Sequence, residues 1–105
     1  MVVRRKWGWY ATIWAGRKWK IKILRFRKGG EISFQKHHKR GELWLFLSGT
    51  GIFTWTRRGE KSQFIGRGDS IHIFRGEWHH YLAIYPTTVL EIQYGDCRED
   101  DIERI

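Results

Sequence analysis

The feature that most constrains the fold of this chain is the frequent occurrence of turns that contain glycine. Short apolar or alternating runs are separated by turns that contain glycine, and no stretch shows a sustained apolar period of 3.6 residues. Short strands at a spacing of roughly 8–12 residues, with turns between them, are typical of β-sandwiches and β-barrels. We therefore predict an all-β fold, organised as one domain over residues 1–105.

The expected strands follow from the alternation of side chains between the two faces of a strand. In residues 19–26, Trp19, Ile21 and Ile23 share one face, and Lys18, Lys20 and Lys22 share the other. The alternation does not decide which face is buried, so Lys22 lies either in a site or in solvent. We expect strands at residues 9–14, 19–26, 31–38, 43–48, 51–57, 61–65, 70–74, 81–85 and 89–94, turns at 39–41 and 58–59, and a short helical turn after residue 95.

The charge distribution is uneven along the chain. Lys and Arg number 20 against 11 Asp and Glu, which gives a net charge of +9, and the C-terminal tail is acidic. A basic chain with seven Trp residues could bind nucleic acid or attract small anionic substrates. A solvated basic face explains the same charge. Only composition favours nucleic acid, so we do not expect a nucleic-acid partner.

Length and cysteine usage indicate the compartment and the assembly. Cys97 is the single cysteine, which excludes an internal disulfide and suits a reducing environment. No signal peptide or membrane-length apolar run is visible, so we expect a soluble cytoplasmic protein. A domain of 105 residues gains stability from association, and we expect a homodimer.

Candidate metal ligands occur in residues 29–49. Gln35 and His37 are two positions apart and would share one face of a strand, and Glu42 stands at the head of the apolar run 43–47. An amide oxygen, an imidazole and a carboxylate can thus converge from two neighbouring strands, as a divalent metal requires. Each residue type is common, so this triplet needs support from a second stretch.

Residues 68–79 provide that second stretch. Gly68 is followed after five residues by Phe74, then by Gly76 and, two residues later, by His79. With these two stretches the chain resembles the cupin superfamily, whose motifs are G-x5-H-x-H-x3,4-E-x6-G and G-x5-P-x-G-x2-H-x3-N. Gln35 stands in place of the first His, Phe74 in place of the Pro and Ala83 in place of the final Asn. The resemblance implies a cupin jelly-roll barrel, also called a double-stranded β-helix.

The flanking residues resemble the type II phosphomannose isomerase family in particular. Residues 5–10 match R-P-W-G-x-Y except at the Pro, and residues 33–44 match S-L-Q-x-H-H-x-R-x-E-H-W, with Leu43 in place of the His. Residues 90–95 and 99–104 match the family's I-E-V-Q-x-G and E-D-D-I-x-R. The resemblance implies a metal-dependent enzyme of carbohydrate metabolism that interconverts mannose 6-phosphate and fructose 6-phosphate.

The resemblance also assigns roles to individual residues. Arg40, at the family's H-H-x-R position, would bind the sugar phosphate, and Lys22 would approach the sugar or its phosphate. The base is left open between Glu91, His72 and a metal-bound hydroxide; the catalytic set that we predict is Arg40, Lys22 and Glu91. The metal ligands would be Gln35, His37, Glu42 and His79, a mixed set that suits zinc and is compatible with Mn, Fe, Co or Ni.

Two other functions are compatible with the sequence. The substitutions at Leu43 and Phe74 are consistent with a non-catalytic cupin that keeps its pocket for binding a metal or a sugar. A basic nucleic-acid-binding protein is the third possibility, and it rests on composition alone.

Overall fold

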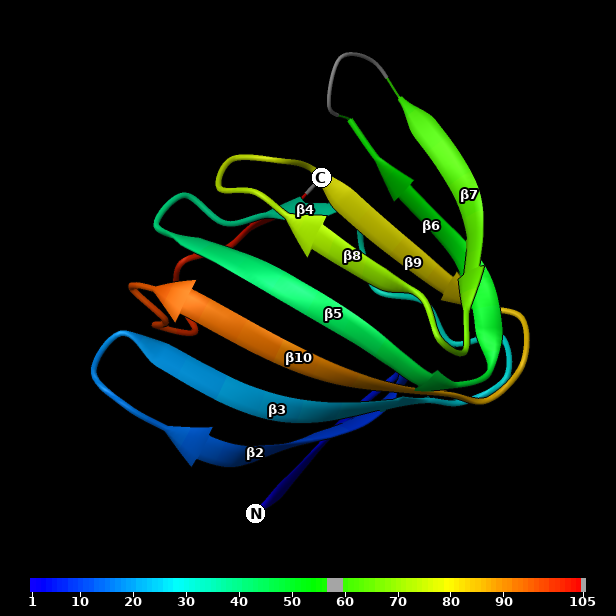
Figure 1. Cartoon of the computed structure of the whole chain (residues 1–105), viewed down its shortest axis with the longest axis horizontal. Helices are drawn as coiled ribbons and strands as arrows, with labels where there is room; N and C mark the ends of the chain where they lie inside the picture. Colours follow the sequence, from blue (N-terminus) through cyan, green and yellow to red (C-terminus); the bar gives the residue numbers. More distant parts are fainter. Residues whose placement is uncertain (57–59, 105) are drawn as a thin grey trace.

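The computed structural model describes residues 1–56 and 60–104, which fold into two antiparallel sheets that pack face to face (Figure 1). One sheet has the strand order β1-β2-β3-β10-β5-β8 and the other the order β11-β4-β9-β6-β7. This confirms the predicted all-β fold. The strands are β1 Val2–Arg5, β2 Gly8–Ala15, β3 Trp19–Phe26, β4 Gln35–Lys36, β5 Arg40–Ser48, β6 Thr50–Trp55, β7 Lys61–Gly66, β8 Ser70–Ile73, β9 His79–Ala83, β10 Thr87–Gly95 and β11 Glu103–Arg104.

Three neighbouring strands, β3, β10 and β5, divide the inside of the sandwich into an apolar part and a polar part. Their inward-facing residues alternate with outward-facing ones, as the pleat of a strand requires. The register places Leu24, Val89 and Phe46 in one row across the sheet, Lys22, Glu91 and Trp44 in the next, and Lys20, Gln93 and Glu42 in a third. Along these three strands, the inward-facing residues are therefore apolar at one end of the sandwich and mostly polar or charged at the other.

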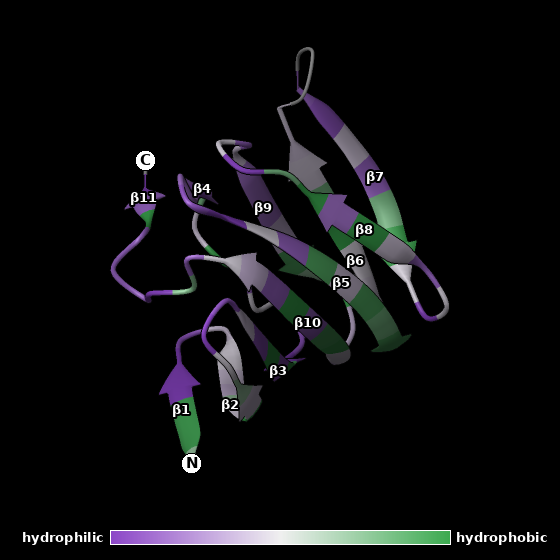
Figure 2. Ribbon diagram, turned by 60° about the vertical axis from the view of Figure 1, so that its left-hand side comes forward, coloured by the Kyte–Doolittle hydropathy of each residue, from purple (hydrophilic) through white to green (hydrophobic). Residues whose placement is uncertain are grey.

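Aromatic rings fill the apolar part. The ring centroids of Phe26 and Tyr81 are 5.1 Å apart, and Trp44 meets Phe53 edge to face at 5.7 Å. All four side chains are buried. Figure 2 shows the hydrophobic stretches of β5 and β10 side by side, at the end of the sandwich away from β11. Large rings therefore fill this end of the sandwich.

The outer face of the six-stranded sheet is also apolar. Ile23, Leu90 and Leu45 form one row across it, and Ile21, Ile92 and Leu43 form the next. All six are half-buried in the single chain. A contiguous apolar face of this kind is typical of protein–protein contacts, and two copies could pair it with itself about a two-fold axis. The homodimer remains a prediction, which sedimentation equilibrium would check, with this face as the proposed contact.

Several expected boundaries were wrong. Residues 31–38 do not form one strand. Residues 29–32 follow β9 through two hydrogen bonds with Ala83 and one with Tyr81, which make only an isolated bridge, and β4 is the one regular strand in this stretch. Arg40 and Gly41 belong to β5 instead of a turn, because they pair with the end of β10. The tail makes a turn and then β11 rather than a helical turn. The predicted turn at residues 58–59 lies outside the described residues. Among the residues that are described, no helix is long and apolar enough to cross a membrane.

Candidate metal centre

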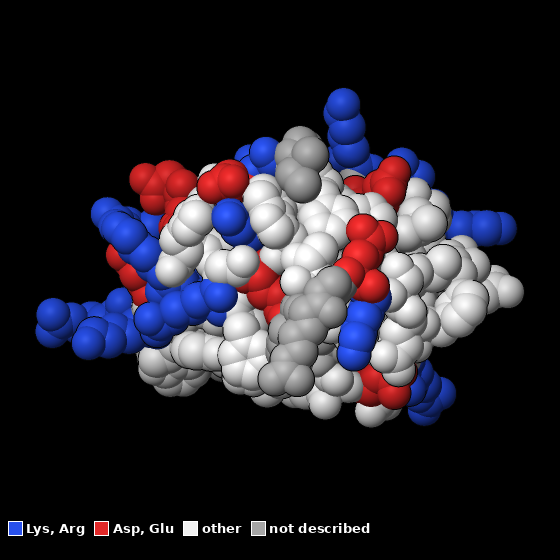
Figure 3. Space-filling model, turned by 90° about the horizontal axis from the view of Figure 1, so that it is seen from above, with Lys and Arg blue, Asp and Glu red and all other residues white. Residues whose placement is uncertain are grey.

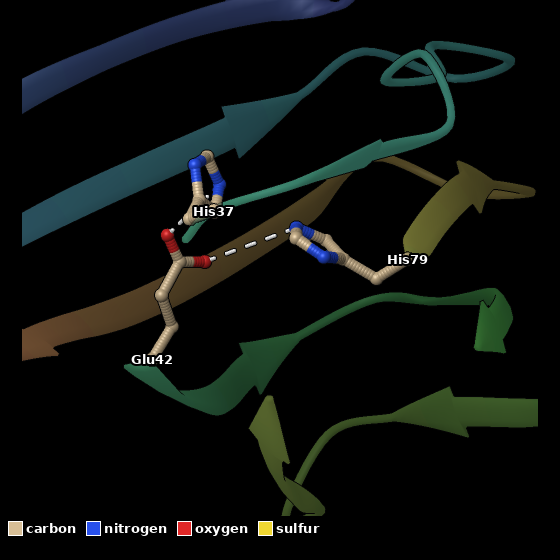
Figure 4. Close-up of side chains that lie close together, drawn as sticks. All are labelled: His37, Glu42 and His79. Atoms are coloured by element: carbon tan, nitrogen blue, oxygen red, sulfur yellow. Dashed lines mark ion pairs between the residues drawn. The ribbon is translucent and has the colours of Figure 1, made fainter. Parts of the chain in front are cut away.

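Three buried side chains converge at the polar end of the sandwich. His37 follows β4, Glu42 lies in β5 and His79 begins β9 (Figure 4). One ligand-type atom from each lies within 4.8 Å of the others. His37 Nε2 is 3.3 Å from Glu42 Oε2, and His79 Nε2 is 4.0 Å from Glu42 Oε1. The structure therefore brings together three of the four residues predicted as metal ligands.

Backbone carbonyls orient both imidazole rings. His37 Nδ1 lies 2.7 Å from the carbonyl oxygen of Asp101, and His79 Nδ1 lies 3.2 Å from that of Glu77. A ring that donates through Nδ1–H keeps the lone pair of Nε2 for a metal, which is the usual outer-sphere arrangement of a metal-binding histidine. In the described residues, His79 Nε2 is buried with no hydrogen-bond partner. Such a nitrogen is unfavourable unless a ligand completes it, so the group fits a cation.

Both histidines are held neutral. Burial, followed by the charge of Arg40, lowers the pKa of His37 from 6.5 to about 4. Burial, followed by the neighbouring His37, lowers the pKa of His79 from 6.5 to about 4. Metal binding requires unprotonated imidazole. The two rings are thus in the required state at neutral pH before any metal arrives.

These pKa values predict that the two histidines contribute stability to the metal-free protein that is lost as the pH falls from about 6.5 toward about 4. At these two rings the unfolded chain binds more protons than the folded one in that window, so their contribution is complete above the unfolded pKa and is lost on acidification. Each histidine would account for up to about 3 kcal/mol. Glu91, whose raised pKa of about 8 has the opposite effect over this range, is present in both proteins, so urea denaturation with chelator should compare the wild type with a variant in which Gln replaces both rings. A difference in the free energy of unfolding between these two proteins that is the same at pH 7 and pH 5 would contradict the prediction.

Gln35 and Arg40 lie beside this group. Gln35 is opposite His79 in the pairing of β4 with β9 and lines the cavity described below, and its role as a fourth ligand remains a prediction. Arg40 is buried, with its Nε 3.0 Å from Glu42 Oε2 and its NH2 group 3.2 Å from His37 Nε2. The guanidinium thus neutralises Glu42 when no other cation is bound. A metal on His37 would take the lone pair that Arg40 now uses.

A cavity of about 160 Å³ opens next to the candidate ligands. Lys22, Arg40 and Glu91, the residues predicted as catalytic, all line it, and so do Gln35 and Glu42. The alternation in β3 left Lys22 undecided, and the structure places it inside, with only 4% of its surface exposed. His72 is exposed, bonds the Tyr94 hydroxyl and is absent from the cavity lining.

Glu91 is a second buried carboxyl group of the cavity, beside Glu42. Trp44 Nε1 donates to Glu91 Oε2 at 2.9 Å and to Glu42 Oε1 at 3.1 Å, and Gln93 Nε2 donates to Glu91 Oε1 at 2.7 Å. Burial, and then the charge of Glu42, raises the pKa of Glu91 to about 8. A carboxyl group that titrates near neutrality can both accept and donate a proton in catalysis.

Sequence reasoning missed the contribution of the tail. Glu99 bonds Lys22, and the backbone of Asp101 orients His37, although 77 and 64 residues separate these pairs in the chain. Both acidic residues lie in the stretch 99–104 that matched the isomerase pattern. That match was the one available signal, because no periodicity reports a contact over such a separation.

Comparison with known proteins agrees with this geometry. Residues 1–105 match the family described as the C-terminal part of mannose-6-phosphate isomerase. The xanthan biosynthesis protein XanB of Xanthomonas campestris pv. campestris and mannose-1-phosphate guanylyltransferase 2 of Escherichia coli are each 34% identical over 105 residues. Each match covers 97% of this chain but only 22% and 21% of the relative. The chain thus spans about a fifth of the length of these carbohydrate-metabolism enzymes.

A solved structure confirms the jelly roll. Oxalate decarboxylase from Bacillus subtilis, a cupin, superposes with a TM-score of 0.86 over the whole of this chain and 30% of its own, at 17% identity. Another structure of that enzyme was determined to assign its Mn(II) centres. An identity this low shows the shared fold and no more, whereas the family match covers every residue of the sequence. The chain therefore belongs to the mannose-6-phosphate isomerase C-terminal family of cupins.

Proposed function

We propose that this domain is a metal-dependent isomerase that interconverts mannose 6-phosphate and fructose 6-phosphate. The observation that carries the proposal is the position of Glu42, which belongs to the cluster with the two neutral histidines and also lines a cavity that holds two buried cations and a carboxyl group with a pKa near 8. The relatives supply the sugar class, since two of them bear names of mannose 1-phosphate chemistry or polysaccharide synthesis.

The residues in and beside the cavity divide the chemistry among them. His37, Glu42 and His79, with Gln35, would hold a divalent metal, for which zinc suits the donor set and Mn, Fe, Co or Ni are alternatives. When bound, the metal would polarise the oxygens on C1 and C2. Lys22 and Arg40 would bind the phosphate.

Glu91 is the proposed proton carrier. Its carboxylate would take the proton from C2 of the open-chain aldose and return it to C1, while the O2 hydroxyl proton moves to O1. Trp44 and Gln93 hold both carboxyl oxygens, so the group is oriented before the substrate binds. Burial keeps water from competing for the proton.

One observation favours a second candidate, a binding domain without turnover. Arg40 already bonds Glu42 and His37, so the buried charge is balanced without a metal. The Leu43 substitution no longer favours this candidate, because its half-buried side chain lies on the outer face and removes nothing from the cavity.

The test is a coupled assay of mannose 6-phosphate turnover after dialysis against each candidate metal. The isomerase proposal expects activity that chelator removes and that one of the metals restores. Binding of metal or sugar phosphate without turnover supports the second candidate and contradicts the first. Salt-sensitive binding to single-stranded DNA, with neither metal nor turnover, would contradict both.

A further inference from the structure

The C-terminal segment 98–104, here called the strap, covers one side of the cavity. Gly95 turns the chain away from β10 with a φ of +101°, and a Cβ there would lie 2.5 Å from the Lys39 carbonyl oxygen. The strap then runs to β4, where β11 pairs with Gln35 and Lys36. Glu99, Ile102 and Arg104 of the strap line the cavity. The side of the molecule that carries the C-terminus shows acidic side chains lying against basic ones (Figure 3).

Glu99 occupies a position that suits an anion. Its Oε1 lies 2.5 Å from Lys22 Nζ and 3.3 Å from Lys20 Nζ. The Lys22 side chain is only 5% exposed, so its ammonium requires a negative partner. Burial favours the neutral form of Glu99, but the hydrogen bond and charge of Lys22 outweigh it and lower the pKa. Glu99 therefore stays ionised and serves as the negative partner of Lys22, although its own side chain is 53% exposed.

The cavity is smaller than pockets that typically bind small ligands. Its volume is about 160 Å³, whereas pockets for small ligands span about 300–1,000 Å³. The sheet strands that line it are part of the packed sandwich, so the wall that can yield is the strap. The strap contributes no residue to the buried apolar core, and the acidic side chains of its ion pairs, Glu99 and Glu103, are about half exposed. Exposed ion pairs contribute little to stability. The hydrogen bond between the Asp101 carbonyl and the buried ring of His37 would be broken when the strap opens.

We propose that Lys20, which shares Glu99 with Lys22, joins Lys22 and Arg40 in a phosphate subsite at the edge of the cavity, and that a phosphate monoester binds there by displacing Glu99 and opening the strap. This inference rests on the proposed function for the identity of the ligand. A dianionic phosphate offers more charge and more acceptor oxygens than the single carboxylate it replaces. Arg40, whose NH1 group bonds the strap carbonyl of Arg98 at 3.2 Å, would be freed toward the ligand by the same movement.

The first arm of the test measures affinity for inorganic phosphate by calorimetry on the metal-free chain. Glu99→Gln keeps the shape of the side chain and removes the competing charge, so we expect phosphate to bind roughly tenfold more tightly. Glu31→Gln, a matched charge loss that contacts His80 away from the cavity, should bind phosphate as the wild type does. Equal or weaker phosphate binding by Glu99→Gln would overturn the proposal.

The second arm measures hydrogen exchange, because removing a negative charge could strengthen phosphate binding without any displacement. The amides of His38 and Lys39 donate to the Asp101 carboxylate at 3.1 Å and 2.8 Å, so they report on the strap. Phosphate should accelerate their exchange in the wild type, and protection instead would overturn the proposal. Neither arm needs a metal or turnover, so the two proposals can fail separately. If the strap opens but the domain shows no turnover, only the isomerase proposal is refuted. If the domain is active but its strap stays closed, only this inference is refuted.

Discussion

His79→Ala is expected to lower the affinity of the protein for zinc by more than about 100-fold and to abolish turnover of mannose 6-phosphate. Loss of a residue that merely orients a metal ligand already costs about 10–100-fold, and His79 would supply a ligand atom itself. Its neighbour His80 provides a matched control, since it points away from the site and pairs with Glu31. His80→Ala should leave zinc affinity and turnover unchanged.

Stability must be separated from metal binding in this comparison, because His79 is fully buried and its ring lies parallel to Phe53. Removing the ring leaves a hole that lowers stability without reference to any metal. Thermal unfolding with and without zinc resolves the two effects. Zinc at 100 times its Kd should stabilise the wild type by about 2.7 kcal/mol and should not stabilise His79→Ala. Equal stabilisation of both proteins would remove His79 from the site.

Glu91→Gln is expected to reduce kcat by about 10²- to 10⁴-fold, the usual range for a lost acid–base group, while bound zinc is unchanged. The amide keeps the size of the side chain but cannot carry the C2 proton. Wild-type activity should rise with pH as Glu91, whose pKa is about 8, becomes ionised, and this rise should be absent in the variant. Turnover in the coupled assay and metal content by elemental analysis measure the two quantities.

The control for this variant is Glu31→Gln, an exposed carboxylate outside the cavity. Glutamine at position 91 can keep its oxygen on Trp44 Nε1 and donate its amide to Gln93, whose Oε1 has no partner among the described residues and can turn to accept it. We therefore expect a stability loss of at most about 1 kcal/mol. Unaltered kcat in a folded Glu91→Gln protein would eliminate this residue as the proton carrier. A metal-bound hydroxide, the alternative that the sequence also left open, would then be the base.

The sequence predicted the strands better than it predicted their faces. Alternation in β3 separated Ile21 and Ile23 from Lys20 and Lys22, but the apolar set lies on the outer face and Lys22 is buried. Period-two patterning identifies two faces and assigns the inner one only when the other is polar. Here both faces of the six-stranded sheet carry apolar residues, so only the partner sheet decides which side is covered.

The sequence predicted the part of the candidate site that lies on strands, but not the part that the strap contributes. His37, Glu42 and His79 lie on or beside regular strands, and motif spacing reports such positions well. The strap contacts depend instead on where the chain goes after Gly95, and Glu99 meets Lys22 across 77 positions. The local sequence near residue 99 does not predict this contact, because the contact depends on the direction of the turn at Gly95 and on the attraction between charges far apart in the chain.

One pairing register of β3, β10 and β5 places both the apolar residues of the core and the charged residues of the cavity. A bulge between Thr88 and Val89 precedes the polar rows in β10. Inserting or deleting one residue after it would turn Leu90 and Ile92 inward and expel Glu91 and Gln93, since neighbouring side chains point to opposite faces. The length of this strand is therefore inseparable from the identity of the groups that it delivers to the cavity, whereas the loops that join the strands are under no such restriction.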